Sequence, residues 1–126
     1  MFKVLIALCL TGTVAAAQEA KVTPLMTQEL EGIDGKEGTM IVVEYAPGGS
    51  DARHRHNAHT FVYMLEGSVV MQVKGGKEVR LRPGQTFYES PEDVHTVSRN
   101  ASTTEPARFL VFFVKAQGAA LTKPAN

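Results

Sequence analysis

The chain has 126 residues, which is enough for one domain built around a single hydrophobic core. Lys and Arg together number 13, Asp and Glu together number 13, and the formal net charge is therefore zero. Proteins that bind the nucleic-acid backbone normally carry a basic excess, so this balance argues against nucleic acid as a partner. Because Cys9 is the only cysteine, neither a disulfide framework nor a thiolate metal site can be built.

Residues 1–17 predict a cleaved export signal. Lys3 is followed by an apolar run from Val4 to Leu10 and then by a small-residue stretch that ends at Ala17. The apolar segment is shorter than the roughly 20 residues that a membrane span needs, so cleavage is favoured over anchoring. We expect a mature protein without cysteine and without membrane attachment, located in a bacterial periplasm.

The remaining sequence predicts an all-β domain. Residues 18–38 add at most an edge strand around Leu25, and residues 39–115 form the barrel itself. Short apolar or alternating runs, broken by Gly and Pro, are typical of a sandwich or barrel. These runs cover residues 39–46, 53–56, 60–65, 68–73, 77–81, 86–88, 94–98 and 108–114. Gly75-Gly76 predicts a two-residue hairpin turn, and residues 116–126 predict a loose terminal tail.

All four histidines lie in two short stretches, with His54, His56 and His59 in the first and His95 in the second. In an extended strand, His54 and His56 project to the same face and can reach one ion. His95 is the only distant histidine that can supply a third ligand. Imidazole nitrogen suits the divalent ions from iron to zinc, whereas calcium and magnesium prefer oxygen. The alternative is a pair of surface histidines on an exposed strand.

Two stretches carry a resemblance to a known family. The first, GGSDARHRHNAHTFVYMLEG, resembles the first motif of the cupins, G-x5-H-x-H-x3-E-x6-G, and matches it at Gly48, His54, His56 and Gly67. The second cupin motif is matched more loosely, with shifted spacings, at Gly84, Pro91, His95 and Asn100. The resemblance covers roughly residues 39–115.

The resemblance implies a double-stranded β-helix, or jelly-roll cupin barrel, with a divalent metal held by His54, His56 and His95. Iron is favoured, while manganese, nickel, copper and zinc remain open. The cupin glutamate does not carry over, because Thr60 stands in its place. A neutral hydroxyl is a poor ligand for these metals. His59 becomes a ligand in its stead only if a bulge turns its side chain inward.

A site of three neutral imidazoles leaves the full +2 charge on the metal, which favours an anionic, chelating partner. Together with the resemblance, this predicts a metal-dependent dioxygenase acting on a small organic substrate in a dry pocket lined by Val62, Met64 and Val97. The alternative is a cupin without enzymatic activity that binds a metal or small ligand, as a sensor or stress component. A sugar isomerase is disfavoured because it would usually retain the carboxylate ligand.

Several charged and polar residues lie near the two motifs. Glu89, Glu92 and Asp93 are candidates for a base or for a group that orients a ligand, with plain solvation as the alternative. Arg53 and Arg55 are expected to face solvent. The glycosylation sequon that begins at Asn100 is interpreted as accidental.

Two predicted strands are apolar on both faces. Phe61, Tyr63 and Leu65 alternate with an apolar inward set, and residues 109–114 form an unbroken apolar run. Apolar side chains on the outer face of a sheet would be exposed to water, so we expect another surface to cover them. We expect a symmetric homodimer, the commonest assembly. The alternative is cover by the segment around Leu25 and Met26.

Overall fold

The computed structural model describes residues 19–125. The predicted export signal and Cys9 lie outside this range. The described chain is all β, as predicted, and no helix in it is long and apolar enough to cross a membrane. The strands are β1 (Lys21–Glu29), β2 (Lys36–Tyr45), β3 (His54–Arg55), β4 (His59–Glu66), β5 (Val69–Val73), β6 (Val79–Leu81), β7 (Thr86–Glu89), β8 (His95–Asn100), β9 (Ala107–Ala116) and β10 (Lys123–Pro124).

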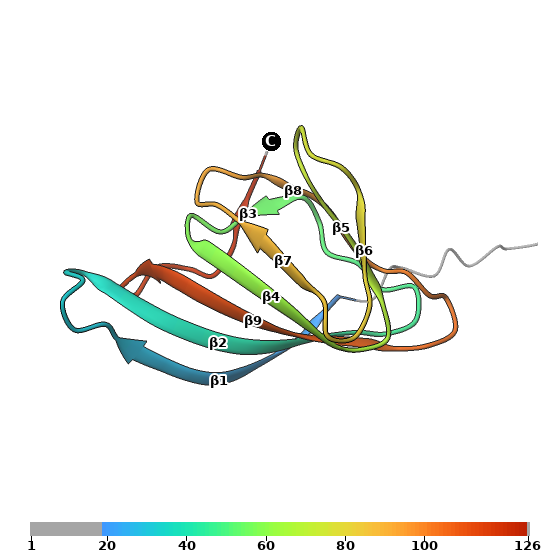
Figure 1. The fold of residues 1–126 in the computed structure, drawn as a ribbon, viewed down its shortest axis with the longest axis horizontal. Coiled ribbons are helices and arrows are strands. Elements are labelled where there is room, and N and C mark those ends of the chain that lie inside the picture. Colours follow the sequence, from blue (N-terminus) through green and yellow to red (C-terminus); the bar gives the residue numbers. More distant parts are fainter. Residues whose placement is uncertain (1–18, 126) are drawn as a thin grey trace, which may run out of the picture.

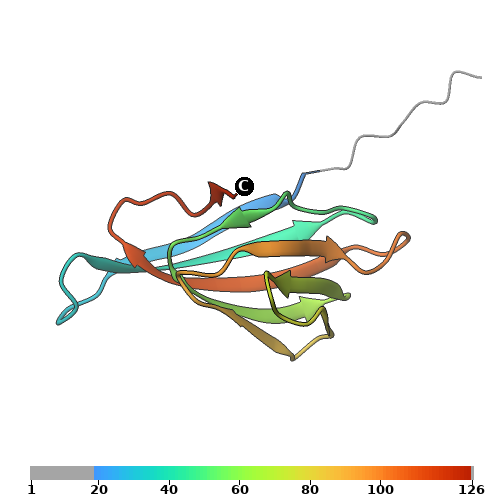
Figure 2. The same ribbon diagram turned by 90° about the horizontal axis from the view of Figure 1, so that it is seen from above.

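The strands form two antiparallel sheets that pack face to face (Figures 1 and 2). The first has the order β1-β2-β9-β4-β7 and the second the order β10-β3-β8-β5-β6. Consecutive strands β4 and β5 lie in different sheets, as do β7 and β8, so the chain winds around a common interior. This is the double-stranded β-helix that the resemblance predicts.

Side-chain alternation decides what fills the interior. Along β4, Thr60, Val62 and Met64 are buried, whereas Phe61 and Tyr63 are exposed on the opposite face. The period of two follows from the pleat of a strand. The same alternation along β2 and β9 gives a core made of Ile41, Val43, Tyr45, Ala58, Val62, Met64, Val69, Met71, Leu81, Ala107, Phe109, Val111 and Phe113.

The edge strand predicted around Leu25 is present as β1, whereas the described part of the C-terminal tail is more regular than the sequence predicts. β1 pairs with β2 along its whole length and forms one edge of the first sheet. The tail does not remain loose, because β10 returns to pair with β3 in the second sheet. Lys115 fixes the chain where the tail begins. Its buried ammonium group contacts the Glu37 carboxylate and donates a hydrogen bond of 2.8 Å to the Ala119 carbonyl.

The turn between β5 and β6 lies one residue earlier than predicted. The amide of Gly76 donates to the carbonyl of Val73 at 2.9 Å, so the turn spans residues 73–76. Gly75, at the third position, has a φ of 83°, which a type II turn requires and glycine adopts without strain.

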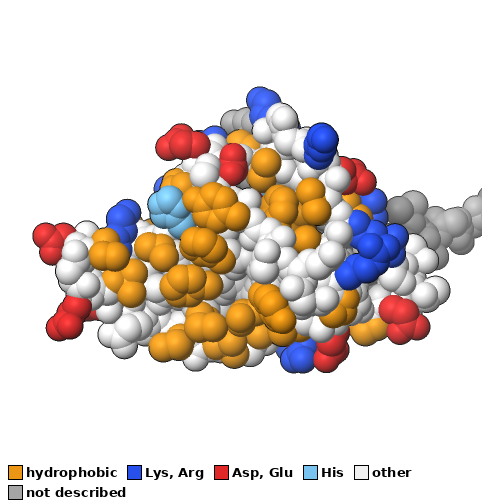
Figure 3. Space-filling model, viewed as in Figure 1, with side chains coloured by type: hydrophobic (Ala, Val, Ile, Leu, Met, Phe, Trp, Pro, Cys, Tyr) orange, Lys and Arg blue, Asp and Glu red, His pale blue; other side chains and the backbone are white. Residues whose placement is uncertain are grey.

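The outer face of the first sheet is apolar, and no segment between residues 19 and 125 covers it. Figure 3 shows hydrophobic side chains gathered over this face, and Phe61, Tyr63 and Tyr88 are each nearly half exposed. The segment around Leu25 does not cover them, because β2 and β9 separate β1 from β4. Leu25 and Met26 are themselves exposed. The alternative of cover by the segment around Leu25 and Met26 is therefore wrong.

Candidate metal centre

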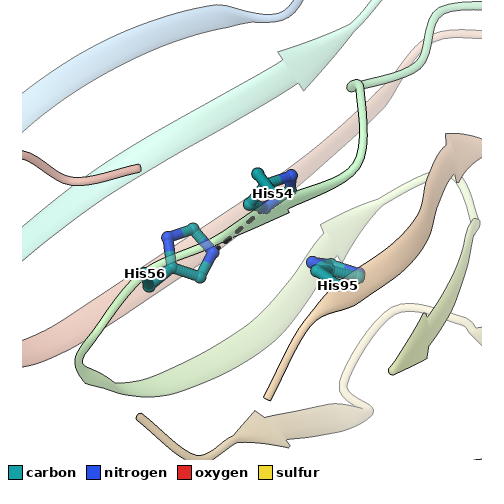
Figure 4. A group of neighbouring side chains, drawn as sticks. All are labelled: His54, His56 and His95. Carbon is teal, nitrogen blue, oxygen red and sulfur yellow. Dashed lines mark hydrogen bonds between the residues drawn. The ribbon is translucent and has the colours of Figure 1, made fainter. Parts of the chain in front are cut away.

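Three of the four histidines converge inside the barrel. His54 begins β3, His56 follows the end of that strand, and His95 begins β8, where it pairs directly with His54. Figure 4 shows the three imidazoles around one point. Taking one nitrogen from each ring, these atoms all lie within 4.8 Å of one another, so the three residues could hold a metal ion.

Backbone carbonyls fix the orientation of two rings. His54 Nδ1 lies 2.7 Å from the Ala52 carbonyl oxygen, and His56 Nδ1 lies 2.7 Å from the Leu121 carbonyl oxygen. A carbonyl only accepts, so each Nδ1 carries the hydrogen and each Nε2 keeps a free lone pair. The two Nε2 atoms are 3.2 Å apart, close to the spacing of two ligands that each lie about 2.1 Å from one ion. Two lone pairs that face each other in this way fit a cation between them.

Burial also favours the metal-binding form of His56. It lowers the pKa of this imidazole, while the charge of Glu89 and the hydrogen bond to Leu121 act in the opposite direction. A lower pKa keeps the ring neutral, and only a neutral imidazole has a lone pair to give to a metal.

An irregularity in β8 explains why His95 and Ser98 both point inward although they are three residues apart. Against β5, the register shifts between the pairs Gln72–Val97 and Val73–His95. Thr96 is the extra residue between these two pairs, and its insertion changes which side chains of β8 point inward. Val97 is consequently not among the cavity residues, which corrects the prediction that it lines the pocket.

The structure brings one further residue, Glu89, to the histidines. Glu89 ends β7, is only 2% exposed, and places Oε1 3.1 Å from His95 Nδ1 and Oε2 3.6 Å from His56 Nε2. The expectation of a centre surrounded only by neutral imidazoles is therefore wrong. The sequence already offered Glu89 as a candidate base or orienting group, and alternation along β7 supports its inward direction, because it is in phase with the partly buried Phe87 that packs against the core.

His59 is not part of this group. It lies on the outer face of β4, and its Nδ1 is 2.6 Å from the Tyr88 hydroxyl. The strand contains no bulge at this point that would turn the side chain inward. Thr60 does point into the barrel and is fully buried, and its hydroxyl donates a long hydrogen bond of 3.4 Å to the Ala58 carbonyl.

A cavity of about 330 Å³ opens beside the histidines. Its walls are mainly apolar, and none of the residues from 19 to 125 that line it is Lys or Arg. Val62 lines it as predicted, whereas Met64 lies in the core outside it. The remaining lining residues are Val22, Ile41, Val43, Asp51, Thr60, Met71, Glu89, Ser98, Phe109, Val111, Phe113, Leu121 and Thr122.

One wall of the cavity is polar. The buried hydroxyl of Tyr45 donates to Asp51 Oδ2 at 2.7 Å and lies 2.6 Å from the Ser98 hydroxyl. Burial raises the pKa of Tyr45, and the Asp51 charge acts in the same direction, so the phenol stays protonated. This bond holds the Asp51 carboxylate at the edge of the cavity.

The other charged candidates lie away from the cavity. Neither Arg53 nor Arg55 lines it, and Glu92 is exposed. Asp93 caps the loop before β8, where its Oδ2 accepts from the Ser90 amide at 2.7 Å. In the described structure, none of these four side chains forms a hydrogen bond or ion pair with the three histidines, whose polar partners are Ala52, Leu121, Glu89 and one another.

Asn100 has a structural role. Its side-chain amide donates to the Ala46 and Glu105 carbonyls at 3.1 and 2.7 Å, and its Oδ1 accepts from the Ser102 amide at 2.9 Å. At 4% exposure it is too buried to accept a glycan, in agreement with an accidental sequon.

Comparison with known proteins agrees with this architecture. Residues 41–113 match the cupin domain family, which is more than half of the chain. This protein belongs to the cupin family. No curated protein sequence matches it.

Several solved structures share this cupin's fold. A protein with a double-stranded β-helix domain from Klebsiella pneumoniae superposes with a TM-score of 0.66 at 18% identity, covering 86% of this chain and 89% of that one. The DMSP lyase DddQ from Ruegeria pomeroyi gives 0.59 at 23% identity, covering 66% and 41%. An oxalate oxidase in complex with glycolate gives 0.61 at 24% identity, covering 80% and 53%. The chain thus spans about half or less of the length of these two enzymes. At these sequence identities, the similarity establishes the fold alone.

Proposed function

We propose that this cupin binds one divalent transition-metal ion through His54, His56 and His95 and presents it to a small organic molecule in the adjoining cavity. The observation that carries the proposal is the pair of Nε2 atoms of His54 and His56. Both have free lone pairs and face each other at 3.2 Å, because each ring is fixed through its Nδ1. Iron is the favoured ion, with manganese, nickel, copper and zinc as alternatives.

The lining of the cavity limits the charge and polarity of the organic molecule that can bind in it. Its walls are largely apolar, the described lining contains no cationic side chain, and two carboxylates, Asp51 and Glu89, lie on it. A molecule with several negative charges would meet only the metal as a positive partner and would be repelled by both carboxylates. The cavity therefore favours a small, mainly apolar molecule with one metal-binding group, such as an enolisable diketone, a thiol carboxylate or a flavonol.

We further propose a metal-dependent dioxygenase reaction on such a molecule. A bound ion would supply open coordination positions and, as iron, redox chemistry. The chain's own contribution is to exclude water with Val62, Val111 and Phe113 and to hold the imidazoles in place through backbone carbonyls. In the competing proposal, a cupin without catalysis, the same cavity binds the ligand and releases it unchanged.

The metal centre is tested by elemental analysis of the mature protein, purified without a histidine tag. We expect about one ion per chain, and a large loss of metal in His54→Ala, His56→Ala and His95→Ala. His59→Ala is the matched control, because it removes an imidazole from the outer face, and Arg55→Ala is a second control. Both should keep full metal content. Equal content in all five variants would contradict the metal centre.

The reaction is tested by oxygen uptake. The iron-loaded protein should consume oxygen with one of the three substrate types named above, and His95→Ala should abolish the rate while His59→Ala leaves it unchanged. Saturable binding of the same molecules, without oxygen uptake for any of the five metals, would favour the protein without catalysis.

Location and assembly are further parts of the proposal. The charge, apolar run and small-residue ending of residues 1–17 favour export to a periplasm. The uncovered apolar face around Phe61, Tyr63 and Tyr88 favours a two-fold homodimer.

A further inference from the structure

Glu89 faces the position at which the cupin motif has its glutamate. Thr60 on β4 and Glu89 on β7 are direct partners in the antiparallel pair, and both side chains point into the barrel. Directly opposed residues on one face have their Cβ atoms about 4.5–5.5 Å apart. A carboxylate on β7 therefore reaches the same part of the interior as a carboxylate at position 60 would reach.

Among the described residues, no Lys or Arg forms an ion pair with Glu89, and its near neighbours are His56 and His95. Its Oε1 lies 3.1 Å from His95 Nδ1, but these two atoms are not aligned for a hydrogen bond, and neither they nor His95 Nε2 have another partner among the described residues. The side chains that line the cavity include no Lys or Arg from the part of the chain that the structure describes. A buried carboxylate without compensation is strongly unfavourable, so the arrangement calls for a cation.

We propose that Glu89 is a metal ligand that replaces the glutamate missing at Thr60, supplied from the facing strand. Its Oε2 lies 3.6 Å from His56 Nε2, a nitrogen that is free to bind the ion. This inference rests on the proposed metal centre. The carboxylate cancels one of the two charges of the ion, so the bound centre carries +1 and favours a neutral or singly charged organic partner.

A purely orienting role for Glu89 makes a different prediction. In that case its Oε1, 3.1 Å from His95 Nδ1, only accepts the ring N–H and fixes the ring. A glutamine accepts the same hydrogen bond through its amide oxygen but is a poor ligand for these metals. Glu89→Gln therefore separates the two roles, and Glu92→Gln is the matched control because Glu92 is exposed in the following loop.

The test uses Co²⁺ as the probe, with affinity measured by calorimetry and the ligand set measured by visible absorption. We expect Glu89→Gln to weaken Co²⁺ binding by more than about 100-fold, the upper end of what loss of an outer partner costs, and to shift the absorption bands. Glu92→Gln should leave both unchanged. Unchanged affinity and bands in Glu89→Gln, with normal binding by the wild type, would overturn this inference alone. Absence of Co²⁺ binding by the wild type would overturn the metal centre as well.

A relocation experiment guards against a variant that merely unfolds. Thr60→Glu combined with Glu89→Gln moves the carboxylate to the facing position and keeps the number of charges constant. We expect this double variant to bind Co²⁺ at least about tenfold more tightly than Glu89→Gln does. Its circular dichroism spectrum should be like that of the wild type. A folded double variant that binds Co²⁺ no better than Glu89→Gln would contradict ligation by Glu89.

Discussion

His56 Nδ1 lies 2.7 Å from the carbonyl oxygen of Leu121, 65 residues further along the chain. The C-terminal tail therefore holds one of the three converging imidazoles, and it also contributes Leu121 and Thr122 to the cavity wall. The tail is fixed at its start by Lys115 and near its end by the pairing of β10 with β3.

Removal of the tail is expected to weaken metal binding without unfolding the barrel. A chain that ends at Gln117 lacks the acceptor that orients His56, and loss of such an outer partner costs about 10- to 100-fold in affinity. Calorimetry with Co²⁺ measures the effect. A deletion of Ala125 and Asn126 alone leaves Leu121 and β10 in place and serves as the control, with affinity like that of the full chain. Equal affinity in all three proteins would show that the tail does not support the centre.

The ion pair between Glu37 and Lys115 predicts a pH dependence of stability. The hydrogen bond from Lys115 holds the pKa of Glu37 below its ordinary value of 4.5. A carboxyl whose pKa is lower in the folded protein stabilises the fold above its unfolded pKa, and this contribution disappears as the pH falls through the folded pKa. Glu37→Gln should therefore lower the Tm at pH 7, and the difference from the wild type should shrink below about pH 4.

Thermal unfolding followed by circular dichroism at pH 7 and at pH 3 measures this dependence. Glu92→Gln, which removes an exposed carboxylate, should leave the Tm nearly unchanged at both values. A Tm difference for Glu37→Gln that grows as the pH falls would have the wrong sign for this pair.

The apolar outer face predicts self-association. Phe61 and Tyr88 lie with their ring centroids 5.2 Å apart, and both are nearly half exposed. Light scattering of the mature protein should give twice the monomer mass, and Phe61→Lys should reduce it to the monomer because a charge cannot be buried there without a partner. Val79→Lys, on the other sheet, should remain a dimer. A monomeric wild type would show that a second copy does not cover this face.

Gly67, the last glycine of the first motif, is expected to be intolerant of substitution. It has a φ of 69°, and a Cβ atom there would overlap the Pro106 carbonyl oxygen and lie 3.0 Å from Ala107 Cα. Gly75 has a similar φ of 83° but open space around it. Gly75→Ala should cost about 1–2 kcal/mol through backbone strain alone.

Gly67→Ala combines the same strain with the overlap against the backbone, so it should cost about 1–3 kcal/mol more. Urea unfolding of the two variants measures the difference in the free energy of unfolding. Equal losses would indicate that the backbone around Pro106 moves aside at little cost.

The sequence by itself determined most of the strands of this protein and three residues of its candidate metal centre. Period-two alternation, interrupted by Gly and Pro, identified each strand from β2 to β9, because pleat and turn chemistry act over a few neighbouring residues. The spacing of His54 and His56 and the position of His95 were sufficient to group these imidazoles. Local pattern also placed Phe61 and Tyr63 on the outer face.

Only the tertiary structure decided which distant residues complete the site. Glu89 joins the histidines through the pairing of β7 with β4, and Leu121 reaches His56 because the tail folds back along β3. Alternation along β7 indicates that Glu89 faces inward, but which strand it meets depends on the register of the sheet. No pattern in the sequence indicates the path of the tail. The bulge that removed Val97 from the cavity likewise depends on the register of β8 against β5. The sequence therefore supplied the histidines, and the fold supplied the carboxylate and the support around them.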